Sequence, residues 1–403
     1  MKRYLEKYVF DDLAKKMVFI GGPRQVGKTT FSLNIAKELF NHSEYLSWDI
    51  AKDREKILNL EFQNNSEILI FDEIHKYQNW KNHIKGLYDS RGSEYKIVVT
   101  GSSRLDVYRR GGDSMFGRYH YYRLHPISLA EALKIHNDFK SLEKSYQLNF
   151  SWFNKNSKKI NIRAILDDLL EFGGFPEPFF AKSKRNLNRW QKERKDRVLR
   201  EDIRDLELIR EFSLFQILTD ILPIHVTSVF SLNSLRDKLQ VSHLTLSKWV
   251  QILEDFYYCF RIPQFSPSKI KSLRKMPKLY LWDYSEIEDV SKKFENLIAS
   301  HLLKFVHFLQ DWHGFKIELQ YLRDAEQREV DFLITFNNKP TVAIEIKTNS
   351  SKVSNHLVYF KKRYDIPHTF QVILGKDNES VDFTDQKTGV NVISADKFLT
   401  GLI

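Results

Sequence analysis

The chain has 403 residues, of which 42% are hydrophobic and 29% charged, and it has a formal net charge of +11. This length exceeds what one hydrophobic core organises, so we expect two to four domains, and the modest glycine and proline content argues against long disordered tracts. There is neither an apolar run of eighteen residues nor a start typical of a signal peptide, which predicts a cytoplasmic protein without a membrane span. The single cysteine, Cys259, excludes an internal disulfide and a cysteine-based zinc cluster.

The positive charge is concentrated in two segments. Residues 182–200 contain nine Lys and Arg against two acids, and residues 261–278 contain six Lys and Arg without an acid. Zones of this kind are typical of a protein that binds a polyanion such as DNA. The alternative without a binding function is a solvated helix face or a general preference of the genome for lysine.

A glycine-rich loop follows the first expected strand. Residues 17–20 are predicted to form a buried strand and residues 29–40 an amphipathic helix, with the pattern Gly-x4-Gly-Lys-Thr between them. In that context backbone N–H groups cradle phosphates, the lysine bridges the β- and γ-phosphates and the threonine hydroxyl holds Mg²⁺. We therefore expect ATP with Mg²⁺ to be bound by Gly22, Pro23, Arg24, Gln25, Val26, Gly27, Lys28, Thr29 and Thr30.

Two acids end a later hydrophobic strand, predicted over residues 68–71. Asp72 would hold the magnesium together with Thr29, and Glu73 would polarise the attacking water. Such acids at this distance behind a phosphate loop favour hydrolysis over binding alone. GTP is a weaker alternative to ATP, because no Asn-Lys-x-Asp segment for reading guanine occurs.

The next strand is predicted over residues 96–100 and ends in hydroxyl residues. Of these, Ser102 is our candidate for a contact with the γ-phosphate or the water, and helix capping is the alternative. Arg104 and Arg118 are both candidates for the cation that stabilises the transition-state charge, in the same or a neighbouring subunit. With a further strand at 45–48, the alternation of strands and helices predicts an α/β fold with a parallel sheet covered on both faces.

Five segments in this order resemble a widespread group of prokaryotic ATP-binding proteins, which pair an AAA-type ATPase domain with a C-terminal region of uncharacterised role. The segments are Gly22-Pro-Arg-Gln-Val-Gly-Lys-Thr, Asp72-Glu-Ile-His, Thr100-Gly-Ser-Ser, Phe116-Gly-Arg and Gly173-Gly-Phe-Pro-Glu. The resemblance implies an AAA+ fold and a homo-oligomer, such as a hexameric ring. It implies no substrate.

A helix-turn-helix pattern precedes the second basic segment. Helices are predicted over 232–239 and 243–255, and strands over 257–262 and 278–282 would form a wing around the basic loop. Polar residues of the second helix would face a DNA groove while the loop reaches phosphates. Winged helices also serve as protein-binding modules, so that alternative stays open.

The C-terminal part predicts an αβββαβ order. The helices are expected at 291–309 and 354–364, and the strands at 316–321, 330–336, 341–347, 370–375 and 390–394. Since side chains alternate along a strand, Glu345 and Lys347 would share one face, and Asp331 can approach that face from the neighbouring strand. Two carboxylates and a lysine could then hold Mg²⁺ and activate a water.

The Asp-x13-Glu-x-Lys pattern on this order is similar to the PD-(D/E)XK nuclease superfamily. The resemblance implies that Asp331 and Glu345 are metal ligands, that Lys347 orients the water, and that Glu295 is the additional helical acid, with Mn²⁺ as an alternative to Mg²⁺. Val330 stands where the superfamily usually has proline. Two alternatives remain open: a hairpin with ordinary surface charges, and a nuclease-like fold that binds DNA without cutting it.

We thus expect an ATPase domain at 1–135, a helical connector at 136–211, a winged helix at 212–285 and a nuclease-like domain at 286–403. The leading hypothesis is an ATP-dependent DNA-processing enzyme with a metal-dependent nuclease. The alternative is an ATP-binding switch or scaffold whose nuclease-like domain does not cleave.

Overall fold

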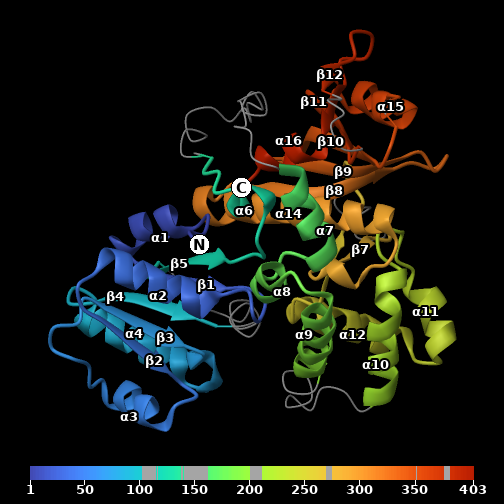
Figure 1. Cartoon of the computed structure of the whole chain (residues 1–403). Helices are drawn as coiled ribbons and strands as arrows, with labels where there is room; N and C mark the ends of the chain where they lie inside the picture. Colours follow the sequence, from blue (N-terminus) through green and yellow to red (C-terminus); the bar gives the residue numbers. More distant parts are fainter. Residues whose placement is uncertain are drawn as a thin grey trace. The chain divides into compact units, whose positions relative to one another are not determined.

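The computed structural model describes residues 1–101, 115, 117–137, 139, 162–199, 211–268, 275–350, 352–375 and 382–403. Its contacts divide the chain into two compact units. The first comprises residues 1–126 with 255–257, and the second comprises residues 127–254 with 258–403. Figure 1 gives the labels of the helices and strands.

The first unit is built around a parallel sheet in the order β2-β3-β4-β1-β5. Its strands are β1 (Met17–Gly21), β2 (Ser43–Ser47), β3 (Ile68–Asp72), β4 (Lys96–Thr100) and β5 (Tyr119–Arg123). The helical elements are α1 (Glu6–Leu13), α2 (Lys28–Leu39), α3 (Ala51–Asn59), η1 (Ile74–Lys76) and α4 (Trp80–Arg91). The predicted parallel α/β sheet is therefore confirmed, and Figure 1 shows its strands between the helices, in blue to cyan.

Helices cover both faces of this sheet. Met17 and Phe19 of β1 pack in one core cluster with Ile57 of α3 and with Trp80 and Ile84 of α4. Helices α1 and α2 contact strands of the same sheet but contribute no residue to that cluster. Since successive residues of a strand point to opposite faces, this division places helices on both sides of the sheet.

Strand β5 is the one element of this sheet that the sequence analysis did not anticipate. It reads Tyr-His-Tyr-Tyr-Arg, and only Tyr121 and Tyr122 are buried, so it lacks the apolar run that marks the other strands. It forms the sheet edge beside β1, to which it is paired from Met17 to Gly21. An edge strand is half covered and does not need a continuous hydrophobic sequence.

The second unit begins with helical elements and a small hairpin. The helices are α6 (Leu129–Ala132), α7 (Ile162–Phe172), α8 (Pro176–Ala181), α9 (Lys184–Asp196), α10 (Phe212–Ile221), η6 (Leu222–Ile224), α11 (Leu232–Leu239), α12 (His243–Asp255) and η7 (Tyr284–Glu286). The hairpin consists of β6 (Cys259–Ile262) and β7 (Lys278–Leu281), which pair antiparallel. The two predicted helices of the helix-turn-helix pattern are thus present, and Ser242 caps the second one by accepting a hydrogen bond from the Thr245 N–H.

The rest of the second unit is a six-stranded mixed sheet in the order β12-β13-β11-β10-β9-β8. Its strands are β8 (Ile317–Arg323), β9 (Glu329–Phe336), β10 (Lys339–Lys347), β11 (His368–Ile373), β12 (Phe383–Thr384) and β13 (Asn391–Ser394). The helices are α14 (Val290–His313), α15 (Asn355–Tyr364) and α16 (Ala395–Thr400). The predicted αβββαβ order is confirmed from α14 to β11, the strand predicted at 390–394 is β13, and β12 and α16 are additions.

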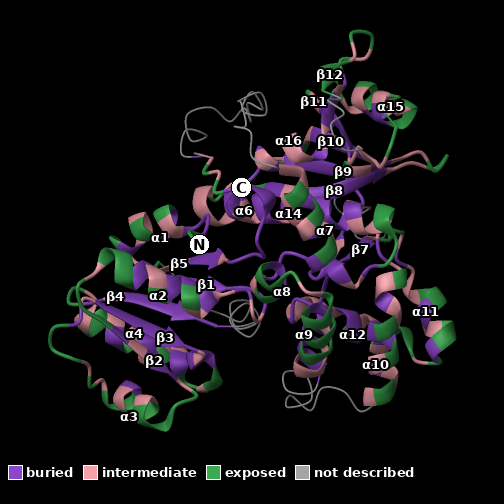
Figure 2. Ribbon diagram, in the orientation of Figure 1, coloured by how far each residue is buried: buried purple, intermediate pink, exposed green. Residues whose placement is uncertain are grey.

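The central strands of this sheet are buried along most of their length, as the purple ribbons of Figure 2 show. Helix α14 packs against β8, and α15 packs against β9 and β10. Among the helices of the described residues, none combines the length and the apolar character needed to cross a bilayer. Each unit contains one of the two groups of residues that the sequence singled out.

Candidate nucleotide site and acidic cluster

The phosphate loop connects β1 to α2 through a turn that requires glycine. Gly22 has a φ of 137°, and a Cβ atom there would lie 2.4 Å from the carbonyl oxygen of Leu124. Gly27 has a φ of 94° and is the N-cap of α2, with no side chain capping the helix. Because L side chains rarely adopt these φ values, the loop conformation depends on both glycines, and it leaves the first N–H groups of α2 available to an anion.

The Lys28 side chain is buried and points back over this loop. Its ammonium donates hydrogen bonds to the carbonyl oxygens of Gly22 at 3.0 Å and Pro23 at 2.8 Å. A second cation supports the loop from outside: the buried Arg3 guanidinium donates to the carbonyl oxygens of Val26 at 3.0 Å and His125 at 2.5 Å. Sequence reasoning missed Arg3, because nothing around it in the chain marks a buried arginine.

Asp72 ends β3 at the same edge of the sheet and is hydrogen-bonded on both carboxylate oxygens. Its Oδ2 accepts from Thr29 Oγ1 at 2.8 Å and from the Tyr45 hydroxyl at 2.7 Å, and its Oδ1 accepts from Thr100 Oγ1. The register explains the contact with Thr100, which stands opposite Asp72 on β4, and Tyr45 lies two residues before Ser47, the residue of β2 opposite Asp72. The predicted pair Thr29 and Asp72 is therefore in direct contact, and Tyr45 and Thr100 are partners that the motif does not encode.

Glu73 follows in a left-handed backbone conformation, with a φ of 55°. Its N–H donates to the Thr100 carbonyl oxygen at 3.1 Å, and its carboxylate lies 3.6 Å from His75 and 3.7 Å from Lys76. Burial raises the pKa of the Glu73 carboxyl above its ordinary value, and the charge of Lys28 opposes part of that shift. A partly desolvated carboxylate of this kind is suited to accept a proton from water.

The residues of this site fit Mg-ATP. A buried ammonium lies over a glycine loop whose helix N-terminus has no side-chain cap, and a hydroxyl and a carboxylate lie side by side behind it. Thr29 and Asp72 would hold the magnesium, and Lys28 with the loop would hold the phosphates. Of the remaining predicted contacts, Arg24, Gln25 and Val26 lie in the loop, and Thr30 is exposed on α2.

In the C-terminal sheet, strands β9 and β10 bring the predicted acids together. Phe332 stands opposite Ile344, and the same antiparallel register places Asp331 beside Glu345. Asp331 Oδ2 accepts from the Ile346 N–H at 2.8 Å, and Glu345 Oε1 lies 2.8 Å from the Lys347 ammonium. Burial, followed by the charge of Asp331, raises the pKa of Glu345 to about 7. Asp331, Glu345 and Lys347 therefore converge.

A further lysine, which the sequence analysis assigned to the basic loop, lies among these acids. The ammonium of Lys278, at the start of β7, is 2.6 Å from Glu329, 3.4 Å from Glu295 and 3.4 Å from Asp331. Lys278 is only 2% exposed. Burial opposes its charged form, but the surrounding carboxylates outweigh burial and raise its pKa. Burial and then the charge of Asp331 raise the pKa of Glu295 to about 8.

This arrangement does not fit the divalent metal that the superfamily resemblance implies. Asp331 accepts from a backbone N–H on one oxygen and faces the Lys278 ammonium with the other. Glu295 accepts from the Tyr280 hydroxyl at 2.9 Å on the oxygen that also faces Lys278. Within the described ranges, no group of three His, Cys, Asp or Glu side chains could hold a metal ion.

Comparison with known proteins agrees with the motifs of the first unit. Residues 14–133 match the model of an AAA domain. This chain contains an AAA domain. Two domains of unknown function follow it: residues 163–295 match DUF8612, and residues 291–398 match DUF4143. The matches thus show an AAA domain within residues 14–133 and assign no role to the two regions that follow it.

Relatives along most of the chain are uncharacterised. A protein of Methanocaldococcus jannaschii is 24% identical over 87% of this chain and 79% of its own length. A protein of Mycobacterium tuberculosis is 20% identical over 83% of this chain and 71% of its own length. Among solved structures, the Walker-type ATPase of Pyrococcus abyssi aligns with a TM-score of 0.41 at 14% identity, covering 69% of this chain and 92% of that one. The Thermotoga maritima RuvB Holliday junction branch migration motor aligns with a TM-score of 0.31 at 18% identity, covering 67% and 94%. These scores are too low to inform function.

Three predicted residues near the AAA domain's site are not placed against it. Ser102 and Arg104 lie outside the described residues. Arg118 forms a two-point ion pair with Asp89 of α4, with Nε 2.6 Å and Nη2 3.1 Å from the carboxylate oxygens. In this arrangement the Arg118 guanidinium serves as a structural partner of Asp89.

Several Lys and Arg side chains of the two basic segments are buried or paired with acids, so fewer of them can bind a polyanion than the net charges suggest. At the ends of the second segment, Arg261 pairs with Glu254 at 2.5 Å and Lys278 is buried, which corrects the expectation that both face a polyanion. In the first segment, four side chains form ion pairs with acids: Lys182, Lys184, Arg194 and Lys195. Arg185, Arg189 and Lys192 are exposed at helical spacing on α9.

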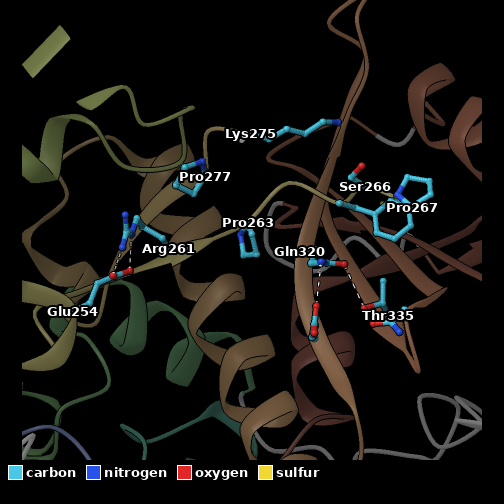
Figure 3. Close-up of a pocket in the computed structure, with 12 residues that line it drawn as sticks. Glu254, Arg261, Pro263, Ser266, Pro267, Lys275, Pro277, Gln320 and Thr335 are labelled. Carbon is cyan, nitrogen blue, oxygen red and sulfur yellow. Dashed lines mark hydrogen bonds and ion pairs between the residues drawn. The ribbon is translucent and has the colours of Figure 1, made fainter. Parts of the chain in front are cut away.

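A pocket of about 670 Å³ opens beside the β6–β7 hairpin and β8. Figure 3 shows Arg261 paired with Glu254 and Gln320 hydrogen-bonded to Thr335 at 3.3 Å. Pro263 and Pro277 also line the pocket. These four polar side chains are engaged with one another, and Lys275 and Ser266 line the pocket as well.

Proposed function

We propose that this protein is an ATP-operated switch on DNA, in which the AAA domain hydrolyses Mg-ATP and the domains that follow bind DNA without cutting it. The hydrogen bond from Thr29 to Asp72, with Glu73 next along the chain, is the observation that supports hydrolysis most directly. It joins the two motifs of a phosphate-hydrolysing site at one edge of the sheet.

Each residue of the AAA site then has a distinct part. Lys28 exchanges the carbonyl oxygens of the loop for the β- and γ-phosphates, and the N–H groups of the loop and of α2 bind the same anion. Thr29 and Asp72 would hold magnesium, which would neutralise the phosphate charge. Glu73 accepts the proton of the attacking water.

Stabilising the transition state needs a further cation. Arg118 could supply it to the site of a neighbouring subunit in a homo-oligomer such as a hexameric ring, provided that it leaves Asp89. Arg104 is the alternative for the same part. The proposal therefore includes a homo-oligomer.

DNA is the proposed partner of the second unit. On α12, Leu246, Val250 and Leu253 are buried, while His243 and Lys248 are exposed, which is the division that a groove-reading helix requires. The exposed cations of α9 add a surface that phosphates would favour. Both features support binding and neither supplies cleavage chemistry.

Metal-dependent cleavage is a second candidate, favoured by the convergence of Asp331, Glu345 and Lys347 on one face. We place it second because Lys278 lies among the acids that would have to hold the metal. Incubation of the purified protein with branched, single-stranded and double-stranded DNA in Mg²⁺ or Mn²⁺ tests it. Cleavage that is lost in Glu345→Ala and Lys347→Ala would establish the nuclease.

The main proposal is tested by measuring ATP turnover with and without DNA. Glu73→Gln should lower turnover on the order of 10²- to 10⁴-fold, as expected for loss of a general base, while Glu61→Gln at an exposed position should not. DNA should change the wild-type rate in a salt-sensitive way. Turnover that Glu73→Gln leaves intact would refute the hydrolytic assignment, and a rate indifferent to every DNA substrate would refute the DNA switch.

A further inference from the structure

Lys278 reaches the acidic cluster from a different element than the acids themselves. It is the first residue of β7, which pairs with β6 in the small hairpin, whereas Glu329 and Asp331 belong to β9 and Glu295 belongs to α14. The cluster therefore joins three elements through one ammonium group. The sequence pattern that predicted a metal site contained the acids but not this cation.

The ammonium faces two of the acids that the predicted metal would need, Asp331 and Glu295, while the third, Glu345, pairs with Lys347. Divalent cations are bound by carboxylate oxygens at about 2.0 to 2.6 Å, so the ligands must close around a single point. Three carboxylates here already face the Lys278 ammonium at 2.6 to 3.4 Å. A divalent ion at that point would both overlap with the ammonium and be repelled by its charge.

Other contacts hold β7 in position, so the ammonium is not a chance side-chain placement. Tyr280, two residues along and on the same face of the strand, donates to Glu295 at 2.9 Å. The buried Asn296 side chain of α14 accepts from the Leu281 N–H and donates to the Leu281 carbonyl oxygen, both at 2.8 Å. These bonds anchor the strand against α14 next to Lys278, so the backbone that carries the lysine is held beside the acids.

We infer that the Lys278 ammonium is a built-in cation that takes the place of the divalent metal in the nuclease-like sheet, and that it ties the β6–β7 hairpin to that sheet. The wild-type domain then binds no metal at Asp331, and its acidic cluster has a structural role. This inference deepens the non-cleaving part of the proposed function but does not depend on the AAA site.

The experiment is a Mn²⁺ titration of the full-length protein without nucleotide, followed by electron paramagnetic resonance and by the midpoint of thermal unfolding. Wild type should show no Mn²⁺ binding that depends on Asp331. Lys278→Ala should gain one such site, because it removes the ammonium that faces Glu295, Glu329 and Asp331, and Mn²⁺ should raise its unfolding midpoint by several degrees. The gain should disappear in Lys278→Ala combined with Asp331→Asn.

Two controls separate this effect from a general change of charge. Lys278→Arg keeps a cation in the cluster and should remain without a site. Lys347→Ala removes a lysine that pairs with Glu345 but leaves Lys278 in place, so it should also gain none.

The inference is overturned if wild type binds a Mn²⁺ ion that Asp331→Asn abolishes, a result that can be read even if Lys278→Ala fails to fold. It is equally overturned if folded Lys278→Ala gains no Mn²⁺ site. Neither outcome touches the proposed ATPase, which is read separately by turnover. A failure of the proposed DNA switch would likewise leave the metal titration interpretable.

Discussion

Thr29 and Asp72 are 43 positions apart in the chain, and their side chains meet in a 2.8 Å hydrogen bond. The threonine is the second residue of α2, which follows the phosphate loop, and the aspartate ends β3, two strands away from β1 in the sheet. Both groups are oxygen donors of the kind that Mg²⁺ prefers. The contact marks the point where the two halves of the AAA site join.

The variant Asp72→Asn tests whether Asp72 holds magnesium at this point. It keeps the shape of the side chain but removes the charge that holds magnesium, so the Mg²⁺ concentration for half-maximal turnover should rise on the order of 10- to 100-fold. Magnesium titrations of the ATPase rate measure it. Tyr45→Phe is the matched control, since it removes one hydrogen bond to the same carboxylate and should cost about 1 kcal/mol of stability with turnover preserved. Equal magnesium curves for Asp72→Asn and wild type would contradict the assignment.

The pH dependence of turnover should report Glu73. Burial raises its pKa above the ordinary value of 4.5, and only the charged carboxylate can accept a proton. The rate at saturating Mg-ATP should therefore fall as pH decreases, with an acid limb centred above 4.5. A pH–rate profile measures this limb. The residual rate of Glu73→Gln should lack it, and an identical limb in that variant would assign the titration to another group.

The exposed cations of α9 should govern the salt dependence of DNA binding. Replacing Arg185, Arg189 and Lys192 together by glutamine removes three phosphate contacts, which should reduce the slope of log affinity against log salt by about 2 to 3. Fluorescence anisotropy over a series of salt concentrations gives the slope.

The control for that experiment carries the same change of charge elsewhere. Lys52, Lys339 and Lys387 are exposed on other elements, and replacing them by glutamine should leave the slope near that of wild type. Equal losses in the two triple variants would show that net charge, and not the α9 surface, determines binding.

His301 should make the second unit sensitive to acid. Its Nε2 accepts from the Leu129 N–H at 3.1 Å and its Nδ1 lies 2.8 Å from the Leu297 carbonyl oxygen, an arrangement that suits only the neutral ring. Burial lowers the pKa of His301 to about 4 from 6.5. Because the folded state then binds the proton less well than the unfolded state, up to about 3 kcal/mol of stability should be lost as pH falls from 6.5 to 4.

Urea unfolding at a series of pH values measures this loss. His301→Gln removes the titrating group, so its stability should depend less steeply on pH over the same range, although its absolute stability will be lower. His243→Gln, at an exposed position on α12, should keep the wild-type slope. Parallel slopes for His301→Gln and wild type would contradict the prediction.

Much of the AAA site was predictable because its chemistry is local. Gly22, Gly27, Lys28 and Thr29 lie within eight residues of one another, and their spacing alone encodes a turn that binds phosphate. The strands β1, β3 and β4 were predictable for a related reason, since buried parallel strands are continuous apolar runs. Strand β5 escaped prediction because an edge strand needs no such run.

The sequence by itself determined the phosphate loop, the order of helices and strands in the C-terminal sheet and the convergence of Asp331, Glu345 and Lys347 across a hairpin. The tertiary structure alone decided which distant charges are neutralised: Arg118 by Asp89, and Asp331 with Glu295 by Lys278. The physical reason is the separation of the partners along the chain. Spacing and periodicity describe residues a few positions apart, whereas a buried charge finds its partner in three dimensions, and Lys278 is 53 positions from Asp331.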